Sequence, residues 1–76
     1  MAELVAFIAR QLVDDPSAVS VETLERDSEV VLRLVVAEAD RGKVIGRQGR
    51  IVRSLRTLVR AGSAREGKRY LLEIAE

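Results

Sequence analysis

The sequence predicts an α+β fold in which a three-stranded mixed sheet carries its helices on one face. Apolar residues repeat with helical spacing over residues 2–13 and 50–62, and they alternate as in strands over residues 19–26, 29–37 and 68–75. A short helix and a glycine turn lie between the second strand and the long helix. The predicted order is therefore helix, strand, strand, helix, turn, helix, strand.

The 76 residues form one predicted domain, 1–76, close to the lower size at which a hydrophobic core alone stabilises a fold. The chain contains no cysteine and no histidine, which excludes disulfides, thiolate nucleophiles, imidazole bases and the usual zinc ligands. We therefore expect no catalytic residues, no metal and no cofactor. No apolar run approaches the ~20 residues of a membrane span, so we expect a cytoplasmic protein without a membrane partner.

The N-terminal helix should end before Pro16, because the residue preceding a proline is disfavoured in a helix. We interpret Asp14 and Asp15 as turn residues and not as a metal or catalytic pair, since no third ligand or base accompanies them. Phe7 and Tyr70, the only aromatic residues, are expected in the core. So few aromatic residues argue against an RRM or an OB-fold, which stack bases on several of them.

The strand over residues 29–37 shows the clearest alternation in the chain. One set of its side chains should face the helices, namely Val30, Leu32, Leu34 and Val36. The other set, Val31, Arg33 and Val35, should face away. Asp27 and Ser28 predict a hairpin to an edge strand over 19–26. Two helices separate the second strand from the third, so these two should be parallel, with Tyr70, Leu72 and Ile74 pointing inward.

The turn between the two predicted C-terminal helices contains two glycines three residues apart. Asp40 is a candidate N-cap for a short helix ending at Ile45, and Gly46 suits the positive φ that often follows a helix. Gly42 inside this helix indicates close packing or an approaching ligand. Gly49 lies where the next helix begins, and a missing side chain there leaves the first-turn N–H groups open to a phosphate. Positive and neutral donors surround the turn: Lys43, Arg47, Arg50 and Gln48.

The long helix over residues 50–62 separates apolar from basic side chains. At ~100° per residue, one arc of about 120° collects Ile51, Val52, Leu55, Leu58 and Val59, which should face the core. Arg53, Arg56 and Arg60 point the opposite way. They are candidates for nucleic-acid contacts and equally for a solvated face, because they project away from the glycine turn. Residues 62–67, with a glycine at each end, are expected to form a loop.

Charge is divided sharply along the chain. Residues 1–40 hold three arginines against nine aspartates and glutamates, a net charge of −6, whereas residues 41–69 hold ten lysines and arginines against Glu66 alone, a net charge of +9. A basic segment that contains the glycine turn is typical of a surface for a polyanion. The acidic half should suppress indiscriminate binding.

The segment Val44-Ile45-Gly46-Arg47-Gln48-Gly49-Arg50-Ile51-Val52 resembles the V-I-G-x-x-G-x-x-[IV] core of KH domains, and the element order resembles their type II arrangement. The whole chain resembles small bacterial single-KH-domain RNA-binding proteins of the KhpA type, although it has Glu38-Ala39 where such proteins are expected to carry a proline. This resemblance implies an RNA chaperone or post-transcriptional regulator that clamps about four nucleotides of single-stranded RNA at the G-x-x-G loop, 46–49. The implied RNA-binding residues are Lys43, Ile45, Gly46, Arg47, Gln48, Gly49 and Arg50.

Two further expectations concern function. An enzyme is not expected, because Gly42-Lys43 lacks the glycine five residues upstream and the following Ser or Thr of a P-loop, and the glycines lack G-x-G spacing. An alternative to RNA clamping is an interaction module that docks a larger KH or RNA-binding protein or a ribosomal particle. Apolar residues on the outer sheet face, Val31, Val35 and Leu71, also predict a homodimer or a heterodimer with another KH-domain RNA-binding protein.

Overall fold

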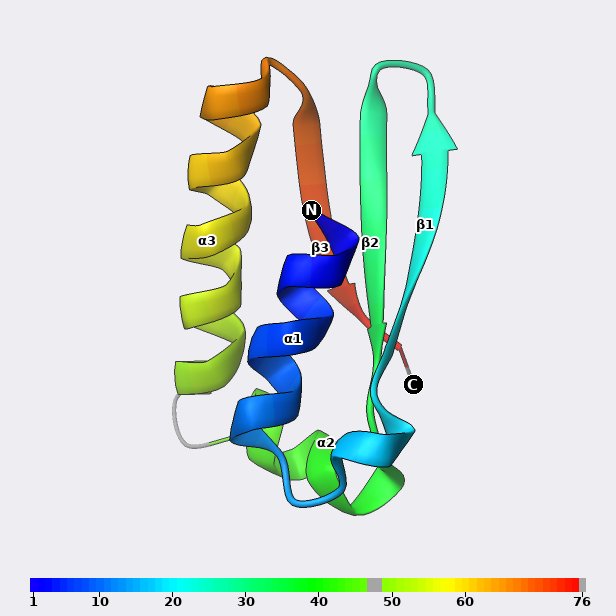
Figure 1. Cartoon of the computed structure of the whole chain (residues 1–76), viewed down its shortest axis with the longest axis vertical. Helices are drawn as coiled ribbons and strands as arrows, with labels where there is room; N and C mark the ends of the chain where they lie inside the picture. The colour runs from blue at the N-terminus through cyan, green and yellow to red at the C-terminus, as the bar shows by residue number, and fades with distance from the viewer. Residues whose placement is uncertain (47–48, 76) are drawn as a thin grey trace.

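The computed structural model describes residues 1–46 and 49–75. These described residues form three α-helices, one short 3-10 helix (η1) and three strands (Figure 1). In chain order these elements are α1 (Ala2–Leu12), η1 (Pro16–Ala18), β1 (Ser20–Arg26), β2 (Glu29–Val35), α2 (Glu38–Ile45), α3 (Arg50–Glu66) and β3 (Arg69–Ile74). The α+β fold and the order of its main elements therefore confirm the sequence prediction.

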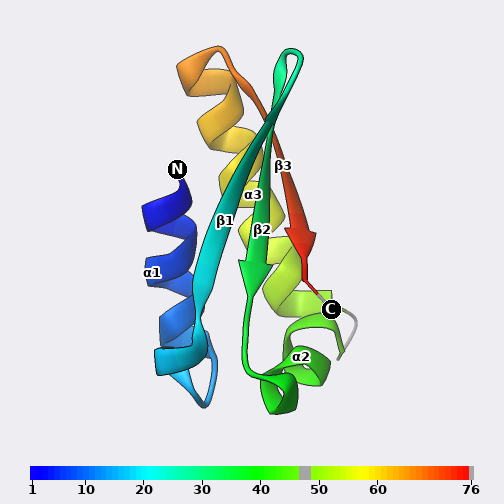
Figure 2. The ribbon, with the colours of Figure 1, turned by 90° about the vertical axis from the view of Figure 1, so that its right-hand side faces the viewer.

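The sheet has the order β1-β2-β3, with β2 in the centre. β1 and β2 are antiparallel and are joined by a tight turn at which Asp27 adopts φ 48°, while β2 and β3 are parallel. Helices α1 and α3 cover one face of the sheet and leave the other face open (Figure 2). The mixed sheet and its one-sided helical layer confirm the predicted topology.

The core lies between the helices and the sheet. Leu32 and Leu34 of β2 are fully buried there, as the alternation of that strand predicted, and Leu72 contributes from β3. The helices supply Val5, Ala6, Ala9, Val44, Val52, Leu55 and Val59. The apolar arc of α3 thus faces the core as expected, with Ile51 and Leu58 half-buried at its margins.

Helix α3 runs one turn further than its sequence predicted. The expected loop over residues 62–67 is wrong, because the helix continues through Gly62 to Glu66 and ends at Gly67, which adopts the left-handed conformation with φ 67°. A side chain at Gly62 would collide with Met1, whose side chain packs there. Gly62 is therefore a packing glycine, and Gly67 is the one that ends the helix.

The two aromatic residues differ in environment. Phe7 is 60% exposed on the outer side of α1, so its predicted place in the core is wrong. The small residues Ala6 and Ala9 face inward instead and let α1 pack closely. Tyr70 packs against the core, donates its hydroxyl to Glu66 Oε1 at 2.7 Å, and donates its main-chain N–H to Ser63 Oγ at 3.0 Å.

Asp40 is a buried structural acceptor and not the predicted N-cap, since α2 begins at Glu38 with Ala37 as its N-cap. Its side chain is 1% exposed, and its two carboxylate oxygens each accept a main-chain N–H at 3.0 Å, one from Asp14 and one from Asp15. These two hydrogen bonds hold the pKa of Asp40 below its ordinary 3.8, and the bond from Asp14 has the larger effect. Burial acts in the opposite direction and raises the pKa. Asp40 thereby ties the turn after α1 to α2.

We predict that Asp40→Asn lowers Tm at pH 7 by roughly 5–10 °C, because an amide nitrogen would face one of the two donors. Folding lowers the pKa of Asp40, so the contribution of this carboxylate to the free energy of unfolding is complete above the ordinary pKa of 3.8. That contribution is lost as pH falls through the folded-state pKa. The Tm gap between variant and parent should therefore narrow below about pH 4. Circular dichroism melts check this, with Glu38→Gln in the same helical turn as control. Equal Tm values at pH 7 would contradict the assigned role.

Candidate nucleic-acid interface

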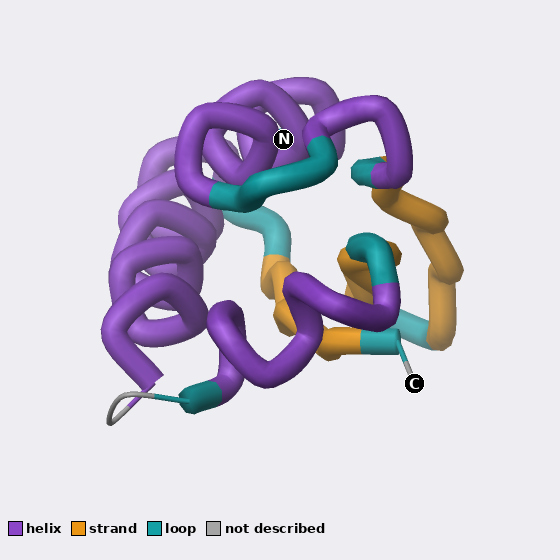
Figure 3. Tube along the Cα trace, turned by 90° about the horizontal axis from the view of Figure 1, so that it is seen from below, coloured by secondary structure: helices purple, strands orange, loops and turns teal. Residues whose placement is uncertain are grey.

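The glycine turn lies at the end of the molecule where α2 meets the N-terminal end of α3 (Figure 3). Gly46 is extended, with φ −76° and ψ −171°, and its N–H donates to the carbonyl of Gly42 at 2.6 Å. The predicted positive φ at Gly46 is therefore wrong. Glycine is required there for a different reason, because a Cβ would collide with the Gly42 carbonyl oxygen.

Positive φ occurs instead at Gly49, the N-cap of α3, with φ 66° and ψ 33°. Its N–H donates to the Gly46 carbonyl at 2.8 Å, which links the two glycines. Within the described part of the chain no side chain caps α3 at this residue. The first-turn N–H groups of this 17-residue helix thus have no side-chain partner among the described residues, and the helix dipole favours an anion there.

Four of the predicted RNA-binding residues meet at this turn in the structure. Ile45, which is 51% exposed, precedes Gly46, and Gly49 is followed by the exposed Arg50. Arg47 and Gln48 lie outside the described residues. The remaining member, Lys43, is paired with an acidic residue on another element.

Lys43 Nζ lies 3.1 Å from Asp14 Oδ1, at the turn that follows α1. Both side chains are substantially exposed, so this pair is weak and can be shared with an incoming phosphate. No local sequence pattern indicates this pairing, because the two residues are 29 positions apart. RNA binding by Lys43 stays a prediction.

A shallow hollow adjoins the turn on the outer side of α2. Its lining consists of Glu38, Arg41, Gly42, Ile45 and Gly46. Nothing lies within 4 Å of a Cβ built on Gly42, so this glycine leaves open space and does not serve close packing. An apolar side chain and exposed backbone therefore meet there between one anion and one cation, which leaves room for a base approaching from outside.

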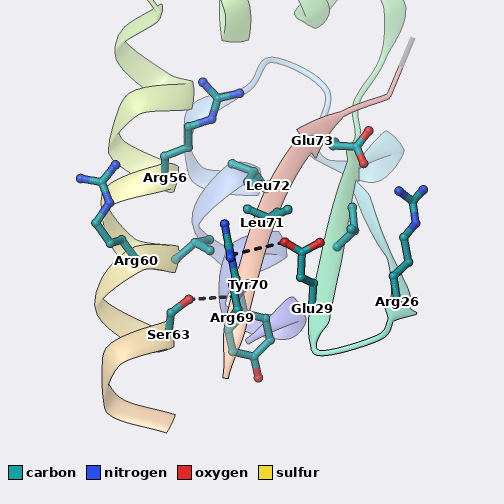
Figure 4. A pocket seen from close by; sticks show the side chains of 12 residues that line it. Arg26, Glu29, Arg56, Arg60, Ser63, Arg69, Tyr70, Leu71, Leu72 and Glu73 are labelled. Carbon is teal, nitrogen blue, oxygen red and sulfur yellow. Dashed lines mark hydrogen bonds and ion pairs between the residues drawn. The ribbon is translucent and has the colours of Figure 1, made fainter. Parts of the chain in front are cut away.

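A larger groove, which we call the α3–β3 groove, lies beside α3 and β3 and reaches residues of β2 and β1 (Figure 4). It has a volume of about 580 Å³ and is lined by Arg26, Glu29, Val31, Arg56, Val59, Arg60, Ser63, Arg69, Tyr70, Leu71, Leu72 and Glu73. Arg56 and Arg60 supply two of its cations from α3. The sequence left open whether these two arginines contact nucleic acid or form a solvated face. The β3 residues of the groove are distant in sequence, and only the tertiary fold brings them beside α3.

In residues 1–46 and 49–75, no three acidic side chains are grouped as a metal ion would require. None of the helices in that part of the chain is long and apolar enough to cross a membrane.

A mixed sheet whose parallel strands are joined by a helix, a G-x-x-G turn and a second helix defines a KH domain, here with the type II order. The family model described as "KhpA/KhpB, KH domain" matches residues 2–74, and the chain belongs to this family. The RNA-binding protein KhpA of Caldanaerobacter subterraneus subsp. tengcongensis is 49% identical over 74 residues, covering 97% of this chain and 99% of that protein. The RNA-binding protein KhpA of Aquifex aeolicus is 45% identical over 76 residues, covering 100% and 96%.

A solved structure supports the fold independently of close sequence similarity. The crystal structure of Aquifex aeolicus Era bound to GDP·AlF4⁻ superposes with a TM-score of 0.63 at 21% identity. The match covers 96% of this chain and 28% of the Era chain. The shared feature is therefore the fold of one region of a larger protein.

Alanine substitution should have opposite effects on stability at Gly42, within α2, and at Gly46, which follows α2. Gly46→Ala should destabilise the fold by roughly 1–3 kcal/mol, because its Cβ meets main chain that cannot move freely. Gly42→Ala should stabilise it by about 0.5–1 kcal/mol, since a helical glycine is replaced where space is open. Urea unfolding of both variants tests this. Equal stabilities would show that the approach of Gly46 to Gly42 is not a constraint.

Proposed function

We propose that this domain is a non-catalytic RNA-binding protein that clamps a short single-stranded RNA segment at the G-x-x-G turn. The observation that carries the proposal is the start of α3 at Gly49, where no side chain of the described residues caps the helix and the first-turn N–H groups and the helix dipole would attract a phosphate. The relatives reported above are named RNA-binding proteins. KH domains hold about four nucleotides at such a loop.

The surrounding surface supports a path for the bound strand. A phosphate at Gly49 would lie beside Arg50, and by their place in the sequence Arg47 and Gln48 would add a cation and a neutral donor. A base could then pack on the exposed Ile45 over the hollow left open by Gly42. Further phosphates would follow the α3–β3 groove past Arg56 and Arg60. Aliphatic contacts and backbone would thus grip the bases.

The cellular role that we propose is that of a cytoplasmic RNA chaperone or post-transcriptional regulator. A single clamp of this size grips few nucleotides, so pairing with a second copy or with another KH-domain RNA-binding protein would raise affinity through effective concentration. RNA that binds two linked clamps would dissociate only when both open.

A second candidate function is docking of a larger RNA-binding protein or a ribosomal particle. The observation that favours it is the outer side of α1, where Leu4 is 45% exposed and Phe7 60% exposed. Co-purification of one protein partner, insensitive to nuclease and lost in Phe7→Ser, would support docking. Nuclease-sensitive association would support RNA clamping.

We predict that Arg47→Asp combined with Gln48→Asp abolishes binding of a short unstructured RNA. The change places two anions between Gly46 and Gly49, where a phosphate would lie, and replaces attraction by repulsion. Fluorescence titration measures the affinity, and circular dichroism melts check the fold. A double variant that melts like the parent and binds RNA equally well would refute clamping at the turn.

The α3–β3 groove gives a separate prediction. Arg56→Ala with Arg60→Ala should weaken RNA binding by about tenfold at low salt, and should reduce the slope of log K against log salt by roughly 1.4, since each phosphate contact to a single strand contributes about 0.7. The matched control is Arg65→Ala, which removes one cation from the exposed last turn of α3 outside the groove lining. If Arg65→Ala weakens binding as much per charge as the groove variants, the arginines act only through net charge.

A further inference from the structure

Four residues on one face of α2 line the shallow hollow beside the glycine turn. They are Glu38, Arg41, Gly42 and Ile45, and their spacing of three, one and three positions aligns them along one side of the helix. Gly46 completes the lining at the end of α2. The hollow has a volume of about 530 Å³, within the range of small-molecule pockets. An anion, a cation, open space and an apolar side chain therefore lie together next to the turn.

The guanidinium of Arg41 contains a buried donor that lacks an acceptor. Among the described residues, Nε of Arg41 is buried and makes no hydrogen bond. No ion pair within residues 1–46 and 49–75 involves Arg41 or Glu38, although both residues line the same hollow. A buried donor without an acceptor is unfavourable, so a ligand that supplies an acceptor is favoured at this side chain. Lys43 differs, since its ammonium group already lies 3.1 Å from the Asp14 carboxylate.

We propose that this hollow, which we call the α2 hollow, recognises a guanine base of the bound RNA. Nothing lies within 4 Å of a Cβ built on Gly42, so a base can enter over this residue. The base would pack against Ile45, which is 51% exposed, and its polar edges would face Arg41 and Glu38. The inference rests on the proposed RNA clamp, because it assigns a base to the strand whose phosphate lies at Gly49.

The two charged side chains require opposite hydrogen-bonding groups from a base. The guanidinium donates and needs acceptors, whereas the carboxylate accepts and needs donors. Guanine carries both kinds as adjacent pairs. Its O6 and N7 are acceptors that match the guanidinium fork of Arg41, and its N1–H and N2–H₂ are donors that match the two carboxylate oxygens of Glu38. No other RNA base presents an adjacent pair of acceptors together with an adjacent pair of donor groups.

Each of the other three bases leaves part of the α2 hollow unpaired. Adenine places its N6–H₂ donor next to N7, which opposes a guanidinium bound to both positions. Uracil has one N–H donor and cytosine one amino group, so either base leaves a carboxylate oxygen without a partner. A site that hydrogen-bonds its ligand rejects an analogue that leaves its polar groups unpaired. Cytosine is the nearest competitor, because its adjacent N3 and O2 acceptors can also face the guanidinium.

Fluorescence titration of the full-length protein with four short RNAs tests this selectivity. One RNA is heptauridine, and the other three carry guanine, adenine or cytosine at its central position. A strand of about seven nucleotides lets its central base reach the hollow while its neighbours occupy the clamp. The parent should bind the guanine RNA about tenfold more tightly than each of the other three, as one bidentate contact can provide. Equal affinity for all four RNAs, or tightest binding of adenine or cytosine, would overturn the inference.

Two conservative variants assign the selectivity to the α2 hollow. Arg41→Lys keeps the charge but removes the planar fork, so the guanine preference should fall by about tenfold. Glu38→Gln should reduce the preference by about threefold, because its amide nitrogen would face a donor of guanine. The readout is the ratio of the affinities for the guanine and uridine RNAs, which a uniform change in affinity does not alter. The matched control, Arg65→Lys in the exposed last turn of α3, should leave this ratio unchanged.

Failure of the RNA clamp and failure of base recognition give different results. If the parent binds none of the four RNAs, the proposed function fails and this inference fails with it. If the parent binds all four without preferring guanine, clamping stands and only the inference is overturned. Circular dichroism melts confirm that each variant folds. A folded Arg41→Lys protein that retains the full guanine preference would also overturn the inference, because Arg41 would then not read the base.

Discussion

The parallel pairing of β2 with β3 is the constraint on which the rest of the structure depends. Parallel neighbours cannot be joined by a hairpin, so residues 36–68 must leave one end of the sheet and return at the other. Helix α2 turns the chain at the end of the sheet, and the 17-residue α3 runs back along it. The junction between them consequently falls at the end of the molecule, outside the core. The position of the helix start at the surface follows from the topology.

The fold was largely predictable because period and alternation depend on local sequence. The strand alternation around Leu32 and the apolar arc of α3 identified the core correctly. The roles of the glycines were harder to predict, because a glycine indicates backbone freedom or limited space without identifying the neighbouring group that requires it. Gly62 accommodates Met1, Gly67 ends the helix, and Gly46 makes room for the Gly42 carbonyl. Each reason lies in a neighbour that the local sequence does not identify.

Part of the candidate site was also predictable, because that part depends on local sequence. The spacing of Gly46 and Gly49 located the turn, and the flanking Ile45 and Arg50 followed from adjacency. The link from Asp40 to the main chain of Asp14 joins residues 26 positions apart, and the α3–β3 groove needs β3 beside α3. Asp14 therefore acts in two ways, since its main chain holds Asp40 while its carboxylate holds Lys43. Such contacts come from tertiary structure and leave no short-range pattern.

Basic side chains gather along α3, whereas the face of the sheet away from the helices pairs acidic with basic side chains across its strands. The most direct test of RNA clamping is an NMR titration of the ¹⁵N-labelled protein with a short unstructured RNA. We expect the largest amide shifts at Gly46, Gly49 and Arg50, with smaller shifts along α3. Large shifts confined to α1 or to the face of the sheet away from the helices, with these amides unmoved, would contradict RNA clamping at the turn.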